Sequence, residues 1–268
     1  MQKIISWNVA SFRARLPLVK MLIEKENPDV LLLQEMKLEA HQYPFEEMEK
    51  QGYYTVLCGQ KSWNGVAVLA KKPLKTQMTC LDGFADQARF VEAVLSDGTT
   101  LISVYVPNGQ PPEKMPQDTS RLKYKLAWMQ ALNAYIAQKI TAKEKFILGG
   151  DFNVIFQDGD VYNPALFEGN ALMVPSVREK LAQLHQTGVV NAIRQFHPQS
   201  GLYTFWDFQG GAWPRNHGIL LDALYVSPTL KGCLMDAGVL KEYRAFEKPS
   251  DHVPIYCVLD EAVSSKKV

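Results

Sequence analysis

The stretch at residues 145–154, KFILGGDFNV, constrains the fold of this chain more than any other segment. Its apolar residues 146–148 favour a strand that is buried on both faces. The glycines at 149–150 let the backbone turn or let another group approach closely. In an extended strand, Asp151 and Asn153 project from the same face, so that both can act on one phosphate or one metal ion. An ordinary turn is the alternative, because Asp, Asn and Gly are common in turns.

Composition places the chain among ordinary globular proteins. It has 268 residues, of which 47% are hydrophobic and 21% are charged. Because no linker, repeat or low-complexity tract interrupts it, we expect a single domain over residues 1–268. The formal net charge of +1 gives no argument for nucleic-acid binding. An anionic ligand would therefore have to be held by a local patch.

The compartment is predicted from the cysteines and from the apolar segments. The four cysteines form no CxxC pair, which favours free thiols in a reducing compartment over disulfides or a zinc site. The chain enters a strand-like run at once, without the apolar region of a signal peptide. No apolar segment approaches the length of a membrane span. We therefore expect a soluble cytoplasmic protein without membrane contact.

The apolar patterns predict more strands than helices. Strands are expected at 3–9, 29–36, 53–58, 65–70, 89–95, 100–106, 146–148, 203–208, 220–227, 233–240 and 253–259. Helices are expected at 13–26, 120–140 and 177–186, the last with a capping box of Ser176 and Glu179. Many strands are apolar throughout, which indicates sheets covered on both faces. Two packed sheets with helices outside satisfy this α/β pattern, and a single mixed sheet remains an alternative.

Polar residues collect where these apolar runs stop. They are Asn8, Glu35, Tyr105, Asn108, Asp151, Asn153, Asp251 and His252, together with Asp222 inside the run ILLDALYV. Each one alone could be a turn residue, an outward-facing residue or a loop histidine. Their recurrence at the ends of successive apolar runs favours one shared site.

The residue types of this set indicate a reaction. The carboxylates and carboxamides offer only oxygen ligands, which suit hard cations, and Mg²⁺ in particular binds few carboxylates together with water and substrate phosphate. His252 beside this acidic group, with Asp222 to orient its ring, can be a charged donor or a base. These groups suit the attack of water on a phosphodiester.

Several segments resemble the exonuclease III family of apurinic/apyrimidinic (AP) endonucleases, within the endonuclease/exonuclease/phosphatase superfamily. They are QEMK at 34–37, NGVAVLAK at 64–71, YVPN at 105–108, LKYKLAW at 122–128, GGDFN at 149–153, YTFWDF at 203–208 and KPSDHVP at 248–254. The resemblance covers nearly the whole chain in collinear order. It implies a four-layer α/β sandwich in which two packed mixed β-sheets are flanked by helices.

The resemblance also implies a catalytic centre. Glu35 would be the principal Mg²⁺ ligand, and Mn²⁺ could substitute for the ion. The remaining metal-site residues would be Asn8, Asp151, Asn153, Asp251 and His252. Asp151 would position or deprotonate the attacking water. His252, oriented by Asp222, would stabilise the transition state at the phosphate.

Substrate contacts follow from the same resemblance. Tyr105 and Asn153 would hold the scissile phosphate, and Asn108 would support the phosphate cradle. A pocket for a flipped-out abasic sugar would be lined by Phe205, Ile219 and Leu221. The implied substrate is double-stranded DNA with abasic sites or 3′ blocks. The implied enzyme is a phosphodiesterase that incises 5′ to abasic sites, with 3′-to-5′ exonuclease or 3′-phosphodiesterase activity beside it. We also expect a monomer.

Three positions depart from the family pattern. Ala10 stands where the family usually has Asn or Asp, which we expect to weaken metal binding. Leu220 and His217 stand where basic residues are common, which leaves the balance of endonuclease to exonuclease activity open. Two alternatives therefore remain: another phosphoesterase of the superfamily, or a DNA-binding paralogue with weak catalysis. The aromatic segment 203–208 and the basic residues Arg121, Lys123 and Lys125 favour DNA as the ligand.

Overall fold

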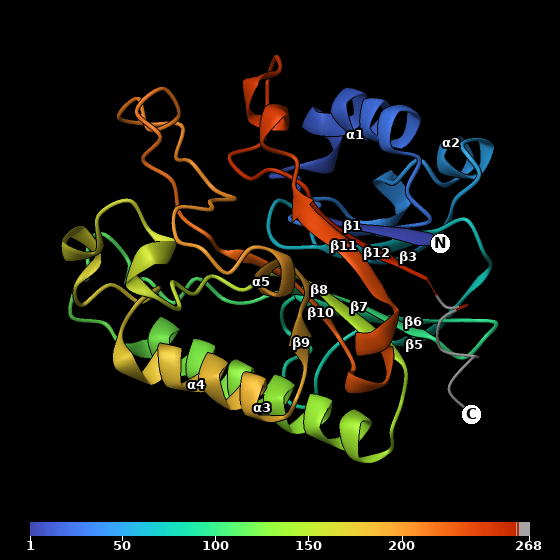
Figure 1. Ribbon diagram of the computed structural model, residues 1–268. Helices are drawn as coiled ribbons and strands as arrows, with labels where there is room; N and C mark the ends of the chain where they lie inside the picture. The colour runs from blue at the N-terminus through green and yellow to red at the C-terminus, as the bar shows by residue number, and fades with distance from the viewer. Residues whose placement is uncertain (261, 263–268) are drawn as a thin grey trace.

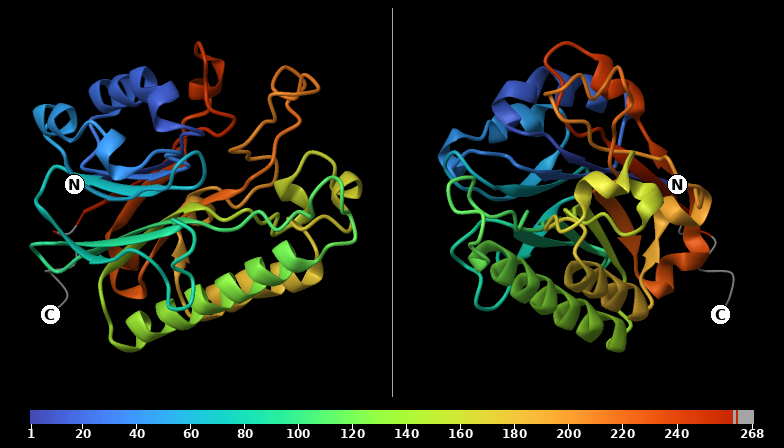
Figure 2. Two further views of the ribbon diagram at one scale, coloured as in Figure 1. Left: turned by 180° about the vertical axis from the view of Figure 1, so that it is seen from behind. Right: turned by 90° about the vertical axis from the view of Figure 1, so that its left-hand side faces the viewer.

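Two six-stranded sheets pack face to face, and helices cover both outer faces (Figures 1 and 2). A computed structural model describes residues 1–260 and 262, so the end of the predicted 1–268 domain lies outside the described residues. Both sheets are mixed, and the four-layer α/β sandwich expected from the sequence is confirmed. Among the described residues, no helix is long and apolar enough to cross a membrane.

The first sheet has the order β11-β12-β1-β2-β4-β3. Its strands are β11 (Leu234–Val239), β12 (Ile255–Leu259), β1 (Gln2–Asn8), β2 (Val30–Gln34), β4 (Val66–Ala70) and β3 (Tyr54–Cys58). The second sheet has the order β5-β6-β7-β8-β10-β9. Its strands are β5 (Leu74–Met78), β6 (Phe90–Leu95), β7 (Thr100–Tyr105), β8 (Phe146–Asp151), β10 (Asp222–Val226) and β9 (Val190–Asn191).

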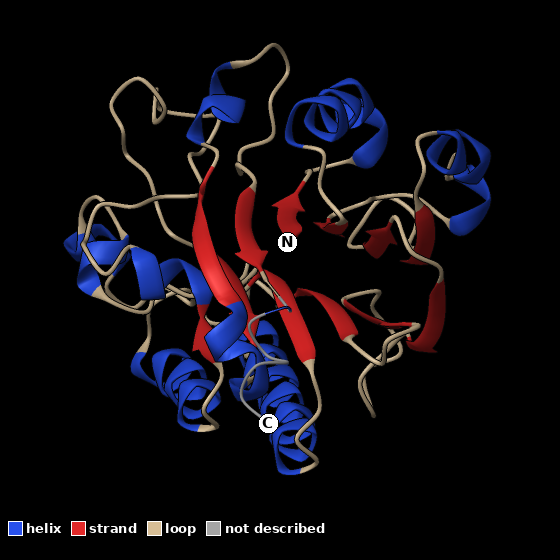
Figure 3. Cartoon of the chain, turned by 45° about the vertical axis from the view of Figure 1, so that its right-hand side comes forward, coloured by secondary structure: helices blue, strands red, loops and turns tan. Residues whose placement is uncertain are grey.

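Each sheet contains a parallel pair that a helix connects. Parallel strands need a long crossover, and α1 (Phe12–Glu26) joins β1 to β2 while α3 (Ser120–Thr141) joins β7 to β8. Together with α2 (Phe45–Lys50), α1 lies outside the first sheet, and α3 and α4 (Pro175–Gln186) lie outside the second (Figure 3). A short α5 (Ala192–Phe196) follows β9. The 3₁₀ turns are Ala40–Gln42, Asp158–Asp160, Pro164–Phe167, Pro228–Cys233 and Lys241–Ala245.

The strands are apolar throughout because both of their faces are buried. On β2, Leu32 packs in the core between the two sheets, whereas Leu31 and Leu33 pack in the core beneath α1. Gly149 lets the sheets approach each other closely. A Cβ atom there would lie 2.7 Å from the side chains of both Leu32 and Leu224. The expectation that the glycine pair permits a close approach is therefore confirmed.

Three local predictions are wrong. Residues 203–208 form no strand; Phe205 makes only isolated bridges to Ile219 and His252. Strand β10 begins at Asp222 instead of residue 220, since Leu220 donates its N–H to Asp160 outside the sheet. The predicted capping box is absent, because α4 begins at Pro175 with Val174 as its N-cap, and this places Ser176 inside the first turn.

Candidate active site

The two parallel strand pairs bring their carboxyl ends together at one end of the sandwich. Asn8 ends β1, and Glu35 directly follows β2. In the second sheet, Asp151 ends β8 beside both Tyr105 of β7 and Asp222 of β10. The polar side chains predicted from separate segments thus meet because the sheets pack in this register.

A single carboxamide joins two of the acids. Asn8 Nδ2 lies 2.9 Å from Glu35 Oε1 and 3.0 Å from Asp151 Oδ2. Asn8 Oδ1 accepts a hydrogen bond from the backbone N–H of Ala10 at 3.0 Å. Glu35 also pairs with Lys37, whose Nζ is 2.7 Å from Oε2. Burial would raise the pKa of Glu35, but the charge and hydrogen bond of Lys37 outweigh it and lower that pKa.

His252 lies between two buried aspartates. Its Nδ1 is 2.8 Å from Asp222 Oδ2, and its Nε2 is 3.5 Å from Asp151 Oδ2. Burial alone would lower the pKa of His252, but Asp222 and then Asp151 raise it to about 10. The pKa of Asp151 is raised to about 7, chiefly by burial, although the neighbouring His252 lowers it. The arrangement is a protonated imidazole held by one aspartate and facing another.

Three of the predicted metal-site residues form a compact group. One ligand atom from each of Glu35, Asp151 and His252 lies within 4.8 Å of the other two. The two carboxylates of Glu35 and Asp151, with Asn8 bonded to both, fit a divalent cation, whereas the protonated ring of His252 lies beside them as a donor. Asp251 lies outside this group, although its charge also raises the pKa of His252.

The asparagines of the loops after β7 and β8 contact each other. Asn108 Nδ2 donates to Asn153 Oδ1 at 3.1 Å. The backbone N–H of Asn153 donates to Asp151 Oδ1 at 2.9 Å, and its Nδ2 donates to Val106 O at 2.9 Å. Asn108 is exposed, whereas Asn153 is buried. The predicted phosphate-binding amides therefore lie beside Asp151.

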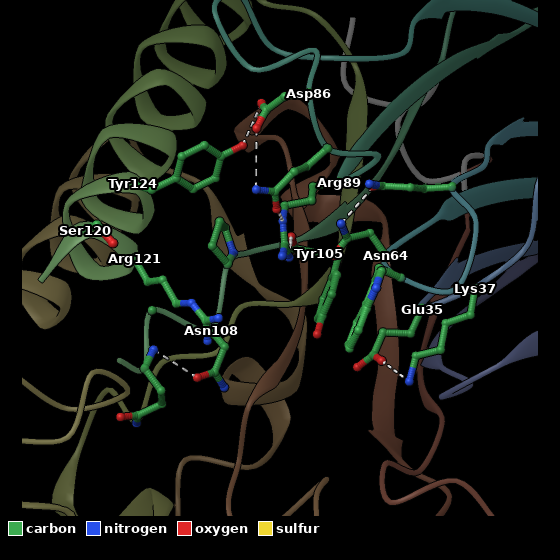
Figure 4. Close-up of a pocket in the computed structure, with 16 residues that line it drawn as sticks. Glu35, Lys37, Asn64, Asp86, Arg89, Tyr105, Asn108, Ser120, Arg121 and Tyr124 are labelled. Carbon is green, nitrogen blue, oxygen red and sulfur yellow. Dashed lines mark hydrogen bonds and ion pairs between the residues drawn. The ribbon is translucent and has the colours of Figure 1, made fainter. Parts of the chain in front are cut away.

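A cavity of about 880 Å³ opens next to this centre (Figure 4). Glu35, Lys37 and Asn64 line one side, Tyr105 lies in the middle, and Arg121 and Tyr124 of α3 line the opposite side. Its other lining residues include Trp63, Asn108 and Arg89, and the Arg89 guanidinium lies 4.7 Å from the centre of the Tyr105 ring. Burial, then Glu35 and Asp151, raise the pKa of Tyr105, so its hydroxyl remains a donor.

Several residues of this cavity were missed from the sequence. Lys37, Trp63 and Arg89 were not predicted, although Lys37 and Trp63 lie in or directly beside the motifs at 34–37 and 64–71. The formal charge of +1 concealed this local grouping. The expectation that Lys125 presents charge to DNA is wrong, because this side chain is fully buried.

The three residues predicted to form a sugar pocket lie together. Ile219 and Leu221 are 4% and 5% exposed, and both pack in one apolar cluster with Ile155, Val161 and Leu172. Phe205 is half-buried against this cluster, with its ring centre 5.0 Å from that of His252. Whether these residues receive a sugar stays a prediction.

The three departures from the family pattern also have clear positions. Ala10 adopts a left-handed backbone conformation, with φ of 46°. His217 stacks on Tyr162 with ring centres 4.2 Å apart. The side chain of Leu220 is buried.

Comparison with known proteins relates the chain to nucleases. Residues 5–252 match the Endonuclease/Exonuclease/phosphatase family. The chain is 29% identical to an exodeoxyribonuclease of Bacillus subtilis over 96% of this chain and 99% of that protein. It is 33% identical to a DNA-(apurinic or apyrimidinic site) endonuclease of Dictyostelium discoideum over 96% of this chain and 70% of that protein. A solved structure of the 3′ phosphatase NExo from Neisseria, bound to a product DNA hairpin, superimposes with a TM-score of 0.89 at 33% identity, covering 97% of this chain and 100% of that one.

Proposed function

Because this chain belongs to the Endonuclease/Exonuclease/phosphatase family, we propose that it is a Mg²⁺-dependent phosphodiesterase of DNA repair. It incises duplex DNA 5′ to abasic sites and acts on 3′ ends, as an exonuclease or by removing 3′ blocks. The observation that carries the proposal is the Asp222–His252–Asp151 arrangement beside Glu35, at distances of 2.8 Å and 3.5 Å. The resemblance to relatives described as exodeoxyribonuclease, AP endonuclease and 3′ phosphatase supports DNA as the substrate.

Asp151 and His252 divide the acid–base work. A pKa of about 7 allows Asp151 to accept a proton from the attacking water near neutral pH. His252 stays protonated, and its Nε2 donates toward the negative charge that develops on the phosphate. Asp222 holds the opposite ring nitrogen and so sets the orientation of the imidazolium.

The phosphate is held by hydrogen-bond donors around the same point. Asn153 and Tyr105 flank Asp151, and Asn108 is bonded to Asn153. These donors are fixed before substrate arrives, because each loop is bonded to its neighbour. Preorganised donors of this kind stabilise the transition state without having to reorient.

Metal binding is assigned to Glu35 and Asp151, with Asn8, Asn153, Asp251 and His252 around them. When bound there, Mg²⁺ would act as a Lewis acid on the phosphate, and Mn²⁺ would substitute for it. The lowered pKa of Glu35 supports this role, since it keeps the carboxylate ionised.

The DNA strand is assigned to the cavity beside the centre. Lys37, Arg89 and Arg121 offer positive charge there, and Trp63, which is 70% exposed, offers a surface for stacking. A flipped abasic sugar is assigned to Phe205, Ile219 and Leu221. We further propose that the protein is a cytoplasmic monomer.

Cleavage assays test this proposal directly. The purified protein is incubated with three labelled duplexes: one with an abasic analogue, one intact, and one with a nick that ends in a 3′-phosphate. Each is assayed with Mg²⁺ and with excess chelator, and Asp151→Asn serves as the inactive control. We expect cleavage of the damaged duplexes in Mg²⁺ only. A protein that leaves all three duplexes intact but hydrolyses a phosphoinositide would be a different phosphoesterase, and the proposal would have to be withdrawn.

A further inference from the structure

A buried ammonium group lies directly behind the phosphate-binding loops. Lys125 of α3 is 0% exposed, and its Nζ donates to three backbone carbonyls. The acceptors are Asn153 O at 2.6 Å, Ala171 O at 2.9 Å and Asn108 O at 3.0 Å. Among the described residues, no carboxylate lies within ion-pair distance of this nitrogen.

The number of acceptors identifies the charged form of Lys125. A neutral amine has two N–H donors, whereas an ammonium has three. Three carbonyls at 2.6–3.0 Å therefore match an ammonium in which every proton is donated. Burial of a charge is unfavourable unless polar groups compensate it. Burial lowers the pKa of Lys125 to about 7, while the negative charge of Asp151 raises it, and the three carbonyls bind the ammonium directly.

The three carbonyls belong to segments that are far apart in the sequence and that also bond to one another, for instance from Asn108 to Asn153 and from Asn153 to Val106. Asn108 follows β7, Asn153 follows β8, and Ala171 lies in the loop before α4. Two of these segments supply the amides assigned above to the phosphate. Because one nitrogen atom binds all three segments, the ammonium sets the spacing between the backbones of Asn108 and Asn153.

Gly109 leaves room for the lysine to reach this position. A Cβ atom on Gly109 would lie 2.7 Å from Lys125 Cδ, closer than side-chain carbons normally approach. Gly109 also has a φ of +84°, which glycine adopts readily. The absence of a side chain at Gly109, in the segment 105–109, therefore lets the aliphatic part of Lys125 pack against the backbone there.

We propose that Lys125 is a positioning residue for the phosphodiester cleavage proposed above, on which this inference rests. Its ammonium holds the Asn108 and Asn153 loops in the geometry that receives the phosphate. Its charge also adds positive potential from beneath the site, where solvent does not screen it. Lys125 acts through these loops and does not touch the substrate, because it is fully buried.

The test compares Lys125→Met with a matched control on the same helix. Lys139 is also a buried lysine of α3, and its Nζ pairs with Glu92 at 3.0 Å and with Glu144 at 2.8 Å. It lies 14 residues further along the helix, or about 21 Å away. Lys139→Met therefore removes a buried charge from α3 without touching the phosphate loops. A third variant, Lys125→Arg, keeps the charge but cannot place three donors at one point.

For each variant we would measure kcat and KM on the duplex that the wild type cleaves best, the melting temperature, and hydrogen exchange of residues 105–110 and 151–155. Lys125→Met is expected to lower kcat by ~10–100-fold with KM within ~3-fold, because misplaced binding groups act mainly on the transition state. Both loops should exchange faster in Lys125→Met than in wild type. Lys139→Met should melt earlier but keep kcat and the exchange of both loops. Lys125→Arg should fall between wild type and Lys125→Met.

Two results would overturn the inference. One is a folded Lys125→Met with the kcat and loop exchange of the wild type. The other is a Lys125→Arg variant whose kcat and loop exchange equal those of the wild type. This second result decides the question if Lys125→Met does not fold. The exchange measurement does not depend on activity. A wild-type protein that fails to cleave DNA would therefore refute the proposed function, whereas unchanged exchange in the Lys125 variants would refute the positioning role.

Discussion

Replacement of Asp222 by Asn should shift the pH dependence of catalysis while leaving the site nearly unchanged in shape. The substitution keeps the size of the side chain and an oxygen that can accept the Nδ1 proton of His252, and it removes one negative charge. In the wild type, Asp222 Oδ2 lies 2.8 Å from Nδ1 of His252, and both side chains are almost fully buried. The pKa of His252 should therefore fall.

The size of the shift follows from the contact. Two opposite charges about 4 Å apart attract by ~4 kcal/mol at an effective dielectric constant of ~20. Since one pKa unit corresponds to ~1.4 kcal/mol, the loss of Asp222 should lower the pKa of His252 by ~3 units. The pKa would then move from about 10 to roughly 7.

The sign of the effect is set by the raised pKa of His252. In the wild type the imidazolium persists through neutral pH and loses its proton only near pH 10. In the variant the proton is lost near pH 7, so only about one tenth of the molecules carry it at pH 8. We expect kcat of the variant to be ~10-fold lower than that of the wild type at pH 8. Below about pH 6 the ratio of the two values should approach one, while protonation of Asp151 lowers both.

Steady-state kcat on damaged duplex from pH 5.5 to 9, at saturating Mg²⁺, measures this shift. The melting temperature of Asp222→Asn, compared with wild type, serves as the folding control. A variant whose profile has the same shape as that of the wild type, at any level of activity, would show that Asp222 does not control the charge of His252.

Four further predictions concern the same centre. Excess chelator should abolish cleavage, and Glu35→Ala should raise the Mg²⁺ concentration for half-maximal activity far more than it raises the Kd for DNA; full activity in chelator would contradict the metal assignment. His252→Asn should lower kcat by ~10²–10⁴-fold, because it removes the donor to the phosphate. Single-turnover rates on damaged duplex measure this loss, and a loss of less than ~10-fold would contradict the role of His252 as that donor. The double variant Phe205→Ala, Ile219→Ala should reduce incision of abasic duplex with unchanged metal dependence, since an abasic sugar leaves the helix without the cost of unstacking a base; equal incision of abasic and intact duplex by the wild type would argue against a sugar pocket. Ala10→Asn should lower the Mg²⁺ requirement and raise the melting temperature, because Asn tolerates a φ of 46° better than Ala and adds an oxygen near the metal site; a metal titration and a thermal melt decide both points.

The residues alone predicted strands buried on both faces and the chemical character of the site, and the family resemblance added the choice of two packed sheets over one. Buried strands such as β2 and β8 have apolar residues on both faces. A run of five or six residues is enough to show this pattern in the sequence. Polar residues such as Glu35 and Asp151 interrupt the pattern where the strands stop, so a sequence can locate them without any knowledge of packing. Oxygen ligands beside a histidine then indicate metal-assisted hydrolysis.

Most contacts between polar groups became visible only from the way the sheets and loops pack, although the Asp222–His252 pair was expected. In sequence, Lys125 resembled a surface lysine among basic neighbours, yet it is buried against the backbones of Asn153 and Ala171. Residues 203–208 have the composition of a strand, yet their N–H groups bond irregularly, for instance from Trp206 to Asp251 O. Local periodicity reports the environment of one element at a time. Contacts between segments 28 or 46 residues apart depend instead on how two sheets and their loops pack together, because the partners lie on different elements.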